Sequence, residues 1–79
     1  MRLLHFAINR EALGCDEEQV SLPAGSTAAD AWAQLVARAP RLAQATRSQM
    51  VAVNSRYASM TEELFDGDEL AFIPPVSGG

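Results

Sequence analysis

The last six residues of the chain suit one kind of covalent chemistry. Pro74 and Pro75 favour extended backbone, Val76 and Ser77 follow, and Gly78 and Gly79 form a tip without side chains. Such a tip is thin enough to enter a narrow channel. Its only reactive group is the α-carboxylate of Gly79, which becomes an acyl donor once it carries a leaving group. Adenylation by ATP on a partner enzyme would supply that group, and sulfur or an amine could then replace AMP.

Two other side chains are candidates for chemistry, His5 and Cys15, and each is the single residue of its type. The chain therefore lacks the residues for an internal disulfide or for the four ligands of a structural zinc ion. Cys15 precedes Asp16, Glu17 and Glu18, whose negative charge opposes thiolate formation. We expect no metal site, no persulfide on Cys15, and a His5 that is hydrogen-bonded within the fold.

Length and charge narrow the class of protein. The chain has 79 residues, 48% of them hydrophobic and 20% charged, which is typical of one small globular domain. The net charge of −4 argues against nucleic acid as a partner, because phosphate binding needs a basic surface. No apolar run approaches the ~20 residues of a membrane span, and no signal peptide is visible. We therefore expect a cytoplasmic protein with no membrane partner.

All six basic residues are arginine. Without lysine, the chain has no side-chain amine for Schiff-base chemistry or for accepting an isopeptide bond. It could still donate its own carboxyl group to a lysine of another protein.

Periodicity and turn residues predict the elements that must position the tail. The apolar residues of the helix recur at a helical spacing, and Ala39-Pro40 marks its end. Gly14 and Asp66-Gly67-Asp68 indicate turns. We predict strands over residues 2–9, 19–22, 51–54, 56–58 and 69–73, a turn over 11–18, a helix over 27–39 and a further helical turn over 41–47.

This order of elements predicts an α+β fold of the β-grasp, or ubiquitin-like, type. A mixed sheet of four to five strands would pack on one main helix. Residues 1–73 would form the β-grasp domain, and residues 74–79 an extended, flexible C-terminal tail. A sheet covered by a single helix leaves one face open, and an apolar patch there marks a protein interface.

The buried face of the first strand has two possible assignments. If Leu3 and Ala7 face the helix together with Leu70 and Phe72, then Phe6 and Ile73 lie on the open face, where Tyr57 could join them. By hydrophobicity alone, Leu4, Phe6 and Ile8 would make the better core. The sequence leaves both assignments open.

Two stretches of the chain resemble the MoaD/ThiS family of ubiquitin-like sulfur carriers, and most of all its small subunits of molybdopterin synthase. One is Phe-Ala-Ile-Asn-Arg-Glu at residues 6–11, followed by Gly14. The other is the whole C-terminal stretch from Asp66 to Gly79. Val53-Asn54 also falls where that family has a Val-Asn pair. Asn9 is a departure, because an apolar residue is commoner at its position.

The resemblance implies a mechanism and a set of partners. An E1-like adenylating enzyme would use ATP and magnesium to adenylate Gly79, and a sulfur donor protein would convert the product to a thiocarboxylate. The chain itself would bind no cofactor. Its sulfur would pass to cyclic pyranopterin monophosphate on a large subunit, which would also hold the catalytic groups. The active assembly would be a heterotetramer of two small and two large subunits. Phe6, Tyr57 and Ile73 would meet the partner, and Pro74, Pro75, Val76, Ser77 and Gly78 would thread its active site.

Three alternatives stay open. The same carrier chemistry could serve another product, such as thiamine thiazole, a thiolated tRNA base or a sulfur-containing amino acid. Gly79 could instead join lysines of target proteins, as in a ubiquitin-like modifier. The chain could also be a binding module without covalent chemistry.

Overall fold

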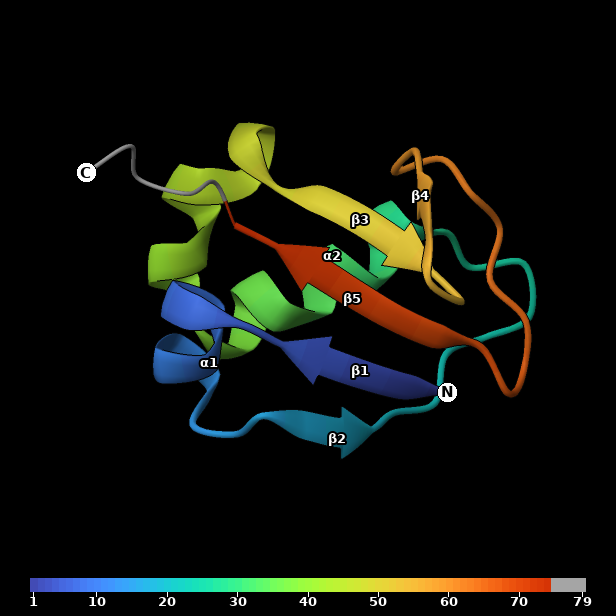
Figure 1. The fold of residues 1–79 in the computed structure, drawn as a ribbon, viewed down its shortest axis with the longest axis horizontal. Coiled ribbons are helices and arrows are strands. Elements are labelled where there is room, and N and C mark those ends of the chain that lie inside the picture. Colours follow the sequence, from blue (N-terminus) through green and yellow to red (C-terminus); the bar gives the residue numbers. More distant parts are fainter. Residues whose placement is uncertain (75–79) are drawn as a thin grey trace.

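The computed structural model describes residues 1–74, which form five strands, two α-helices and one 3₁₀ segment (Figure 1). The α+β fold predicted from the sequence is confirmed. The elements in chain order are β1 (Arg2–His5), α1 (Ala7–Leu13), β2 (Glu17–Gln19), α2 (Ala28–Arg38), η1 (Pro40–Ser48), β3 (Met50–Val53), β4 (Arg56–Ala58) and β5 (Glu69–Ile73).

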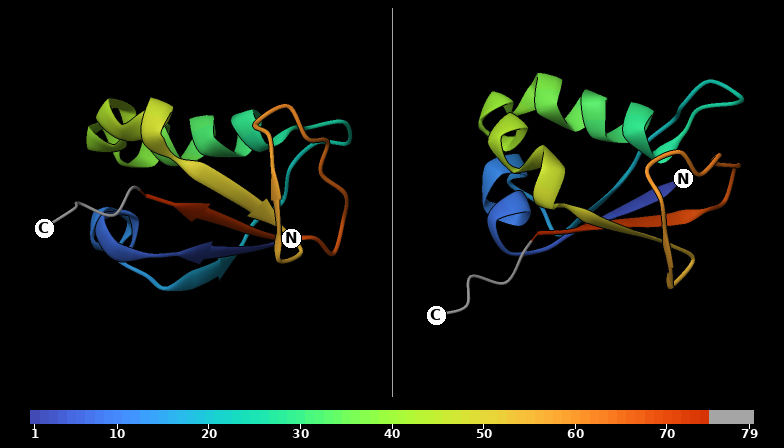
Figure 2. Two further views of the ribbon diagram at one scale, coloured as in Figure 1. Left: turned by 45° about the horizontal axis from the view of Figure 1, so that its top comes forward. Right: turned by 90° about the horizontal axis from the view of Figure 1, so that it is seen from above.

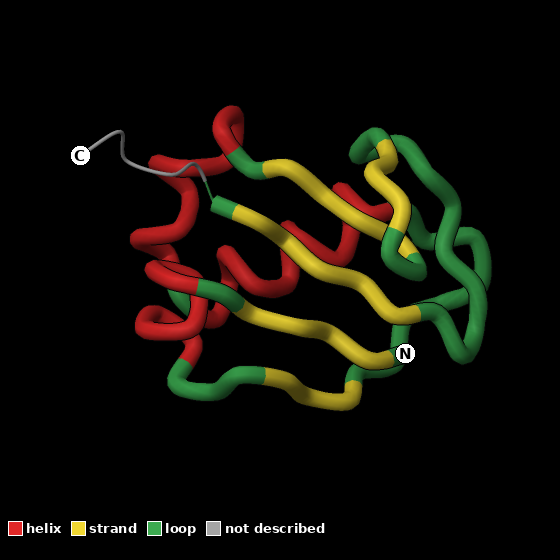
Figure 3. The backbone as a smooth tube through the Cα atoms, in the orientation of Figure 1, coloured by secondary structure: helices red, strands yellow, loops and turns green. Residues whose placement is uncertain are grey.

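The five strands form one mixed sheet in the order β2-β1-β5-β3-β4 (Figure 3). β5, the last strand in the sequence, lies at the centre. It runs parallel to β1, with His5 opposite Phe72, and antiparallel to β3, with Val51 opposite Phe72. The strand that leads into the C-terminal segment is therefore held by neighbouring strands on both sides.

The main helix, α2, begins where its sequence provides a cap. The Thr27 side chain accepts from the Asp30 backbone N–H, and the Asp30 carboxylate accepts in return from the Thr27 N–H, which makes a capping box. The helix ends at Arg38, directly before Ala39-Pro40, as predicted. Figure 2 shows α2 and η1 together on one face of the sheet, and no other described element covers the opposite face.

The core lies between α2 and this covered face. Trp32 of α2 packs against Phe72 of β5 with ring centroids 5.0 Å apart, and its indole N–H donates to Thr46 Oγ1 in η1 at 2.9 Å. The predicted apolar stripe of the helix is thus core at Ala28, Ala31, Trp32 and Leu35. The sheet contributes the residues of one face, namely Leu3, Val51, Val53, Leu70 and Phe72.

The predicted strand over residues 2–9 is correct only as far as His5, and the predicted turn over 11–18 is wrong where its first residues belong to a helix. β1 stops at His5, and residues 7–13 form α1. The chain makes this change of direction at Ala7, which has a positive φ of 48°, and Gly14 ends the helix in the left-handed region at φ 80°. Ala7 therefore does not join the core face of β1, contrary to the expected assignment.

Smaller differences concern the edges of the sheet and the segment after α2. The second strand is Glu17–Gln19 rather than residues 19–22. The expected extra turn is a longer 3₁₀ segment, Pro40–Ser48, that covers the end of the core with Leu42. Among residues 1–74, no helix is long and apolar enough to cross a bilayer.

Candidate functional site

The open face of the sheet carries an apolar row, bordered by the ion pairs of Arg2 with Glu17 and Glu69, and the strand register shows how the row forms. Leu4 lies opposite Ala71, Ala71 opposite Ala52, and Ala52 opposite Tyr57, so these residues form one row across four strands. The neighbouring rows, through Leu3 and Leu70 and through His5 and Phe72, point to the helix. Side chains alternate between faces along a strand, so the row from Leu4 to Tyr57 must point away from α2.

The open apolar face includes the three residues predicted to meet a partner. Phe6 is 45% exposed and Tyr57 is 69% exposed, while Ile73 is half-buried. Met50, opposite Ile73, adds a further exposed apolar side chain that the sequence did not single out. The first assignment of the sheet faces is therefore the observed one, except that Ala7 lies in α1 and is exposed. The roles of Phe6, Tyr57 and Ile73 toward a partner stay predictions.

The open face leads directly to the start of the C-terminal segment. Ile73 is the last residue of β5, and Pro74, the last described residue, is buried. Figure 1 shows the end of β5 on the side of the molecule where α1 and η1 lie. The other predicted tail residues, Pro75, Val76, Ser77, Gly78 and Gly79, lie outside the described residues. Their predicted role in threading and sulfur transfer stays a prediction.

His5 and Cys15 lie in one polar cluster with Glu18 and Arg38. The His5 side chain is fully buried, and its Nε2 lies 2.6 Å from Glu18 Oε2, which confirms the expected hydrogen bond within the fold; its buried Nδ1 has no partner among the described residues. Arg38 Nη1 donates to the other Glu18 oxygen at 2.8 Å, and Cys15 Sγ donates to Oε2 at 3.7 Å. The cluster ties β1, β2 and α2 together at one corner of the fold.

The electrostatics of this cluster are those of an ion pair rather than of a nucleophile. Burial raises the pKa of the Glu18 carboxyl, but hydrogen bonds from Arg38 and His5 outweigh it, so that the pKa is lowered. Burial, followed by the charge of Glu18, raises the pKa of the Cys15 thiol. A thiol of this kind is a poor sulfur carrier. His5, Cys15 and Glu18 each place one donor atom within 4.8 Å of the others, so they are the described residues that could hold a metal ion.

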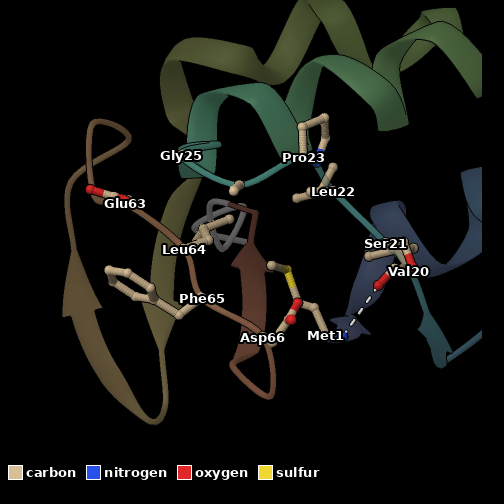
Figure 4. Close-up of a pocket in the computed structure, with 11 residues that line it drawn as sticks. Met1, Val20, Ser21, Leu22, Pro23, Gly25, Glu63, Leu64, Phe65 and Asp66 are labelled. Carbon is tan, nitrogen blue, oxygen red and sulfur yellow. Dashed lines mark hydrogen bonds between the residues drawn. The ribbon is translucent and has the colours of Figure 1, made fainter.

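A pocket of about 290 Å³ lies at the other end of the sheet. It is lined by Met1, the segment from Val20 to Gly25 and the segment from Glu63 to Asp66 (Figure 4). The N-terminal ammonium donates to the Val20 carbonyl at 3.2 Å beside it. Since β1 and β5 both begin near this pocket and both run away from it, the pocket is remote from Ile73 and Pro74.

The fold and the site together define a class of protein. A five-stranded mixed sheet with the C-terminal strand at its centre, packed on one main helix, is the arrangement of a ubiquitin-like β-grasp protein. A family model described as the ThiS family matches residues 3–79. The chain belongs to this family.

Individual relatives agree with that assignment. A molybdopterin synthase sulfur carrier subunit from Chlamydomonas reinhardtii is 38% identical over 81 residues, which cover 100% of this chain and 98% of the relative. The crystal structure of SAMP1 from Haloferax volcanii has a TM-score of 0.80 at 32% identity and covers 99% of this chain and 97% of that one. These findings confirm the predicted β-grasp fold and the predicted class of function, a sulfur carrier of the molybdopterin synthase type.

A more distant solved structure shares the fold alone. It is a chain from a complex of subunits 1 and 2 of the molybdopterin-converting factor from Helicobacter pylori, with a TM-score of 0.63 at 18% identity. The match covers 99% of this chain and 96% of that one.

Proposed function

We propose that this chain carries sulfur as a thiocarboxylate on Gly79 and donates it in the synthesis of the molybdopterin dithiolene. The observation that carries the proposal is the full-length similarity to a curated sulfur carrier together with the C-terminal Pro-Pro-Val-Ser-Gly-Gly sequence. No described side chain offers a competing sulfur site, because the Cys15 thiol has a raised pKa and hydrogen-bonds to a carboxylate.

The chemistry proceeds in three steps. The Gly79 carboxylate attacks the α-phosphorus of ATP on an E1-like enzyme with magnesium, and pyrophosphate leaves. Hydrosulfide supplied by a donor protein then attacks the acyl carbon, and AMP leaves. The resulting thiocarboxylate gives its sulfur to cyclic pyranopterin monophosphate, water restores the carboxylate, and two such transfers complete one dithiolene.

The partner for the last step is a large subunit that contacts the open apolar face, in a heterotetramer of two small and two large subunits. Two observations support this. The open face presents the partly exposed apolar residues Phe6, Met50 and Tyr57, and contiguous exposed apolar surface marks interaction sites. The Helicobacter pylori chain of the same fold was solved as a complex of subunits 1 and 2. The large subunit supplies the pterin pocket and the acid–base groups.

The test is reconstitution with the activating enzyme, ATP, sulfide, the large subunit and the pterin precursor. We expect the intact mass of the chain to rise by the difference between sulfur and oxygen, about 16 Da, and the precursor to be consumed with two sulfurs per product. A Gly79→Ala variant is the matched control for the terminal residue. An unchanged mass of the wild-type chain under these conditions would refute the proposal.

A second function, conjugation to other proteins, is favoured by one observation. SAMP1, the neighbour at 32% identity, is described in a related crystal structure as a small archaeal modifier protein. A protein modifier and a sulfur carrier both form the acyl-adenylate. In a modifier the acyl group passes to an amine, whereas in a carrier it passes to sulfur. Because this chain lacks lysine, it could join targets but could not form lysine-linked chains of itself. Branched Gly-Gly peptides on target lysines in the native host would support this function.

A further inference from the structure

The carboxamide side chains of Asn9 and Gln49 face one another in the interior at the end of β5. Asn9 Nδ2 donates to Gln49 Oε1 at 3.0 Å, and Gln49 Nε2 donates in return to Asn9 Oδ1 at 3.2 Å. Asn9 Nδ2 also donates to the backbone carbonyl of Phe72 at 3.2 Å. Asn9 is completely buried, and Gln49 is buried as well. The amide of Asn9 thus uses both of its N–H donors and its oxygen.

The contact falls at the point where β5 loses a neighbouring strand. Phe72 has His5 of β1 on one side and Val51 of β3 on the other. Ile73 is paired only with Met50 of β3, because β1 ends at His5 and the chain turns away into α1. The side chain of Asn9, projecting from α1, supplies a donor to β5 where β1 has left the sheet.

We propose that Asn9 and Gln49 are positioning residues for sulfur transfer, because they hold the end of β5 and so fix the point at which the C-terminal segment begins. The inference rests on the proposed function, since this starting point matters only if Gly79 delivers a reacting group. If Phe72 and Ile73 detached from the sheet, the segment beyond the fixed body would lengthen by two residues, or about 7 Å at ~3.3–3.6 Å each. Reacting atoms must meet at about 3–3.5 Å, and a misplacement of ~1 Å can cost about 100-fold in rate.

The polarity of the pair favours this role over simple filling of the core. Two apolar side chains of similar size would occupy the same space, but they would leave the Phe72 carbonyl without its donor. A buried pair of amides is a costly way to fill volume, since every polar atom needs a partner. Unlike apolar packing, the three hydrogen bonds of the amides fix the relative positions of α1, the residue before β3 and the end of β5.

The experiment compares Asn9→Leu with a core variant at the other end of β5. Val53→Ala is the matched control, because Val53 is buried in β3 opposite Leu70 and far from Ile73. Each chain is loaded with sulfur, mixed with the large subunit and pterin precursor, and followed in a single turnover at a temperature where it is folded. We expect Asn9→Leu to lower the transfer rate at saturating large subunit about 10- to 100-fold, with a Kd for the large subunit within about twofold of wild type. Val53→Ala should transfer at the wild-type rate.

Equal rates for Asn9→Leu and wild type, or equal losses in Asn9→Leu and Val53→Ala, would overturn the inference. If Asn9→Leu does not fold, Gln49→Leu replaces it, because that variant keeps the Asn9 donor but removes its orienting partner. For Gln49→Leu we expect a rate loss of about three- to tenfold, and a wild-type rate would count against the proposal.

Hydrogen exchange in the isolated chain separates this inference from the proposed function. In the Asn9 or Gln49 variant, protection should fall at the Ile73 amide by at least about tenfold more than at the Leu70 amide. Equal loss at both positions would refute the positioning role whatever the fate of the sulfur. A wild-type chain that acquires no sulfur would instead refute the proposed function and leave the exchange result to decide whether the pair holds β5.

Discussion

Replacing Phe6 by alanine should impair partner binding while leaving the fold largely intact. The Phe6 side chain is 45% exposed on the open face, so a little over half of it is buried. Burying a whole phenylalanine contributes about 1.5–3 kcal/mol, so Phe6→Ala should cost about 1–1.5 kcal/mol of unfolding free energy. An interface anchor on the same residue would cost 2 kcal/mol or more in binding, which is about a 30-fold rise in Kd.

Phe72→Ala provides the contrast within the same sheet. Phe72 is fully buried against Trp32, and removing such a core aromatic costs about 3–5 kcal/mol of stability. Urea unfolding of the isolated chain measures the stability of each variant, and calorimetric titration with the large subunit measures Phe6→Ala binding. A stability loss above about 3 kcal/mol for Phe6→Ala, or a Kd equal to that of wild type, would refute the assignment of Phe6 to a docking face.

Three further outcomes test the fold and the chemistry. The pKa of Glu18 is lowered in the folded chain, so its hydrogen bonds with Arg38 and His5 stabilise the fold at pH values above the ordinary pKa of 4.5, and this stability is lost as the pH falls through the folded pKa. Glu18→Gln should therefore be about 1–3 kcal/mol less stable than wild type at neutral pH and equally stable in acid. A stability difference that urea unfolding finds constant with pH would contradict this. Ser55→Gly should raise the melting temperature by a few degrees, because Asn54 and Ser55 both have positive φ in the two-residue β3–β4 turn; an unchanged or lower melting temperature speaks against strain at Ser55. One residue added after Gly79 should abolish thiocarboxylate formation at an unchanged melting temperature, since it moves the carboxylate by about 3.3–3.6 Å; normal loading of this variant in the mass assay would exclude Gly79 as the sulfur-bearing residue.

The parts of the fold that the sequence predicted correctly are those with local signals. The helix over 27–39 has its cap in Thr27 and Asp30, its periodic apolar stripe and its stop at Pro40, and all of these lie within one segment. The last strand follows the Asp66-Gly67-Asp68 turn directly. Each of these signals acts between residues a few positions apart, so the rest of the chain is not needed to interpret them.

The start of the chain was harder because tertiary contacts decide its structure. Residues 2–9 are apolar at both parities, and hydrophobicity alone favours Leu4, Phe6 and Ile8 as core. The structure instead buries His5, which is possible because Glu18 from the neighbouring strand is its hydrogen-bond partner. The buried residue of α1, Asn9, is likewise hydrogen-bonded to Gln49, a residue 40 positions away. No pattern within the first strand contains that information.

The division of apolar side chains between the two faces of the sheet explains how so small a domain can be stable and still leave one face available for a partner. One face of the sheet, with Leu3, Leu70 and Phe72, carries the contacts with α2, so stability does not depend on filling the other face. The open row from Leu4 to Tyr57 is then free to be apolar for binding. Because β5 contributes to both faces and ends at Ile73, a partner seated on the open face lies next to the start of the C-terminal segment. Substitutions on the two faces should therefore separate stability from docking, while Asn9 and Gln49, at the junction of β5 with that segment, should affect transfer without affecting docking.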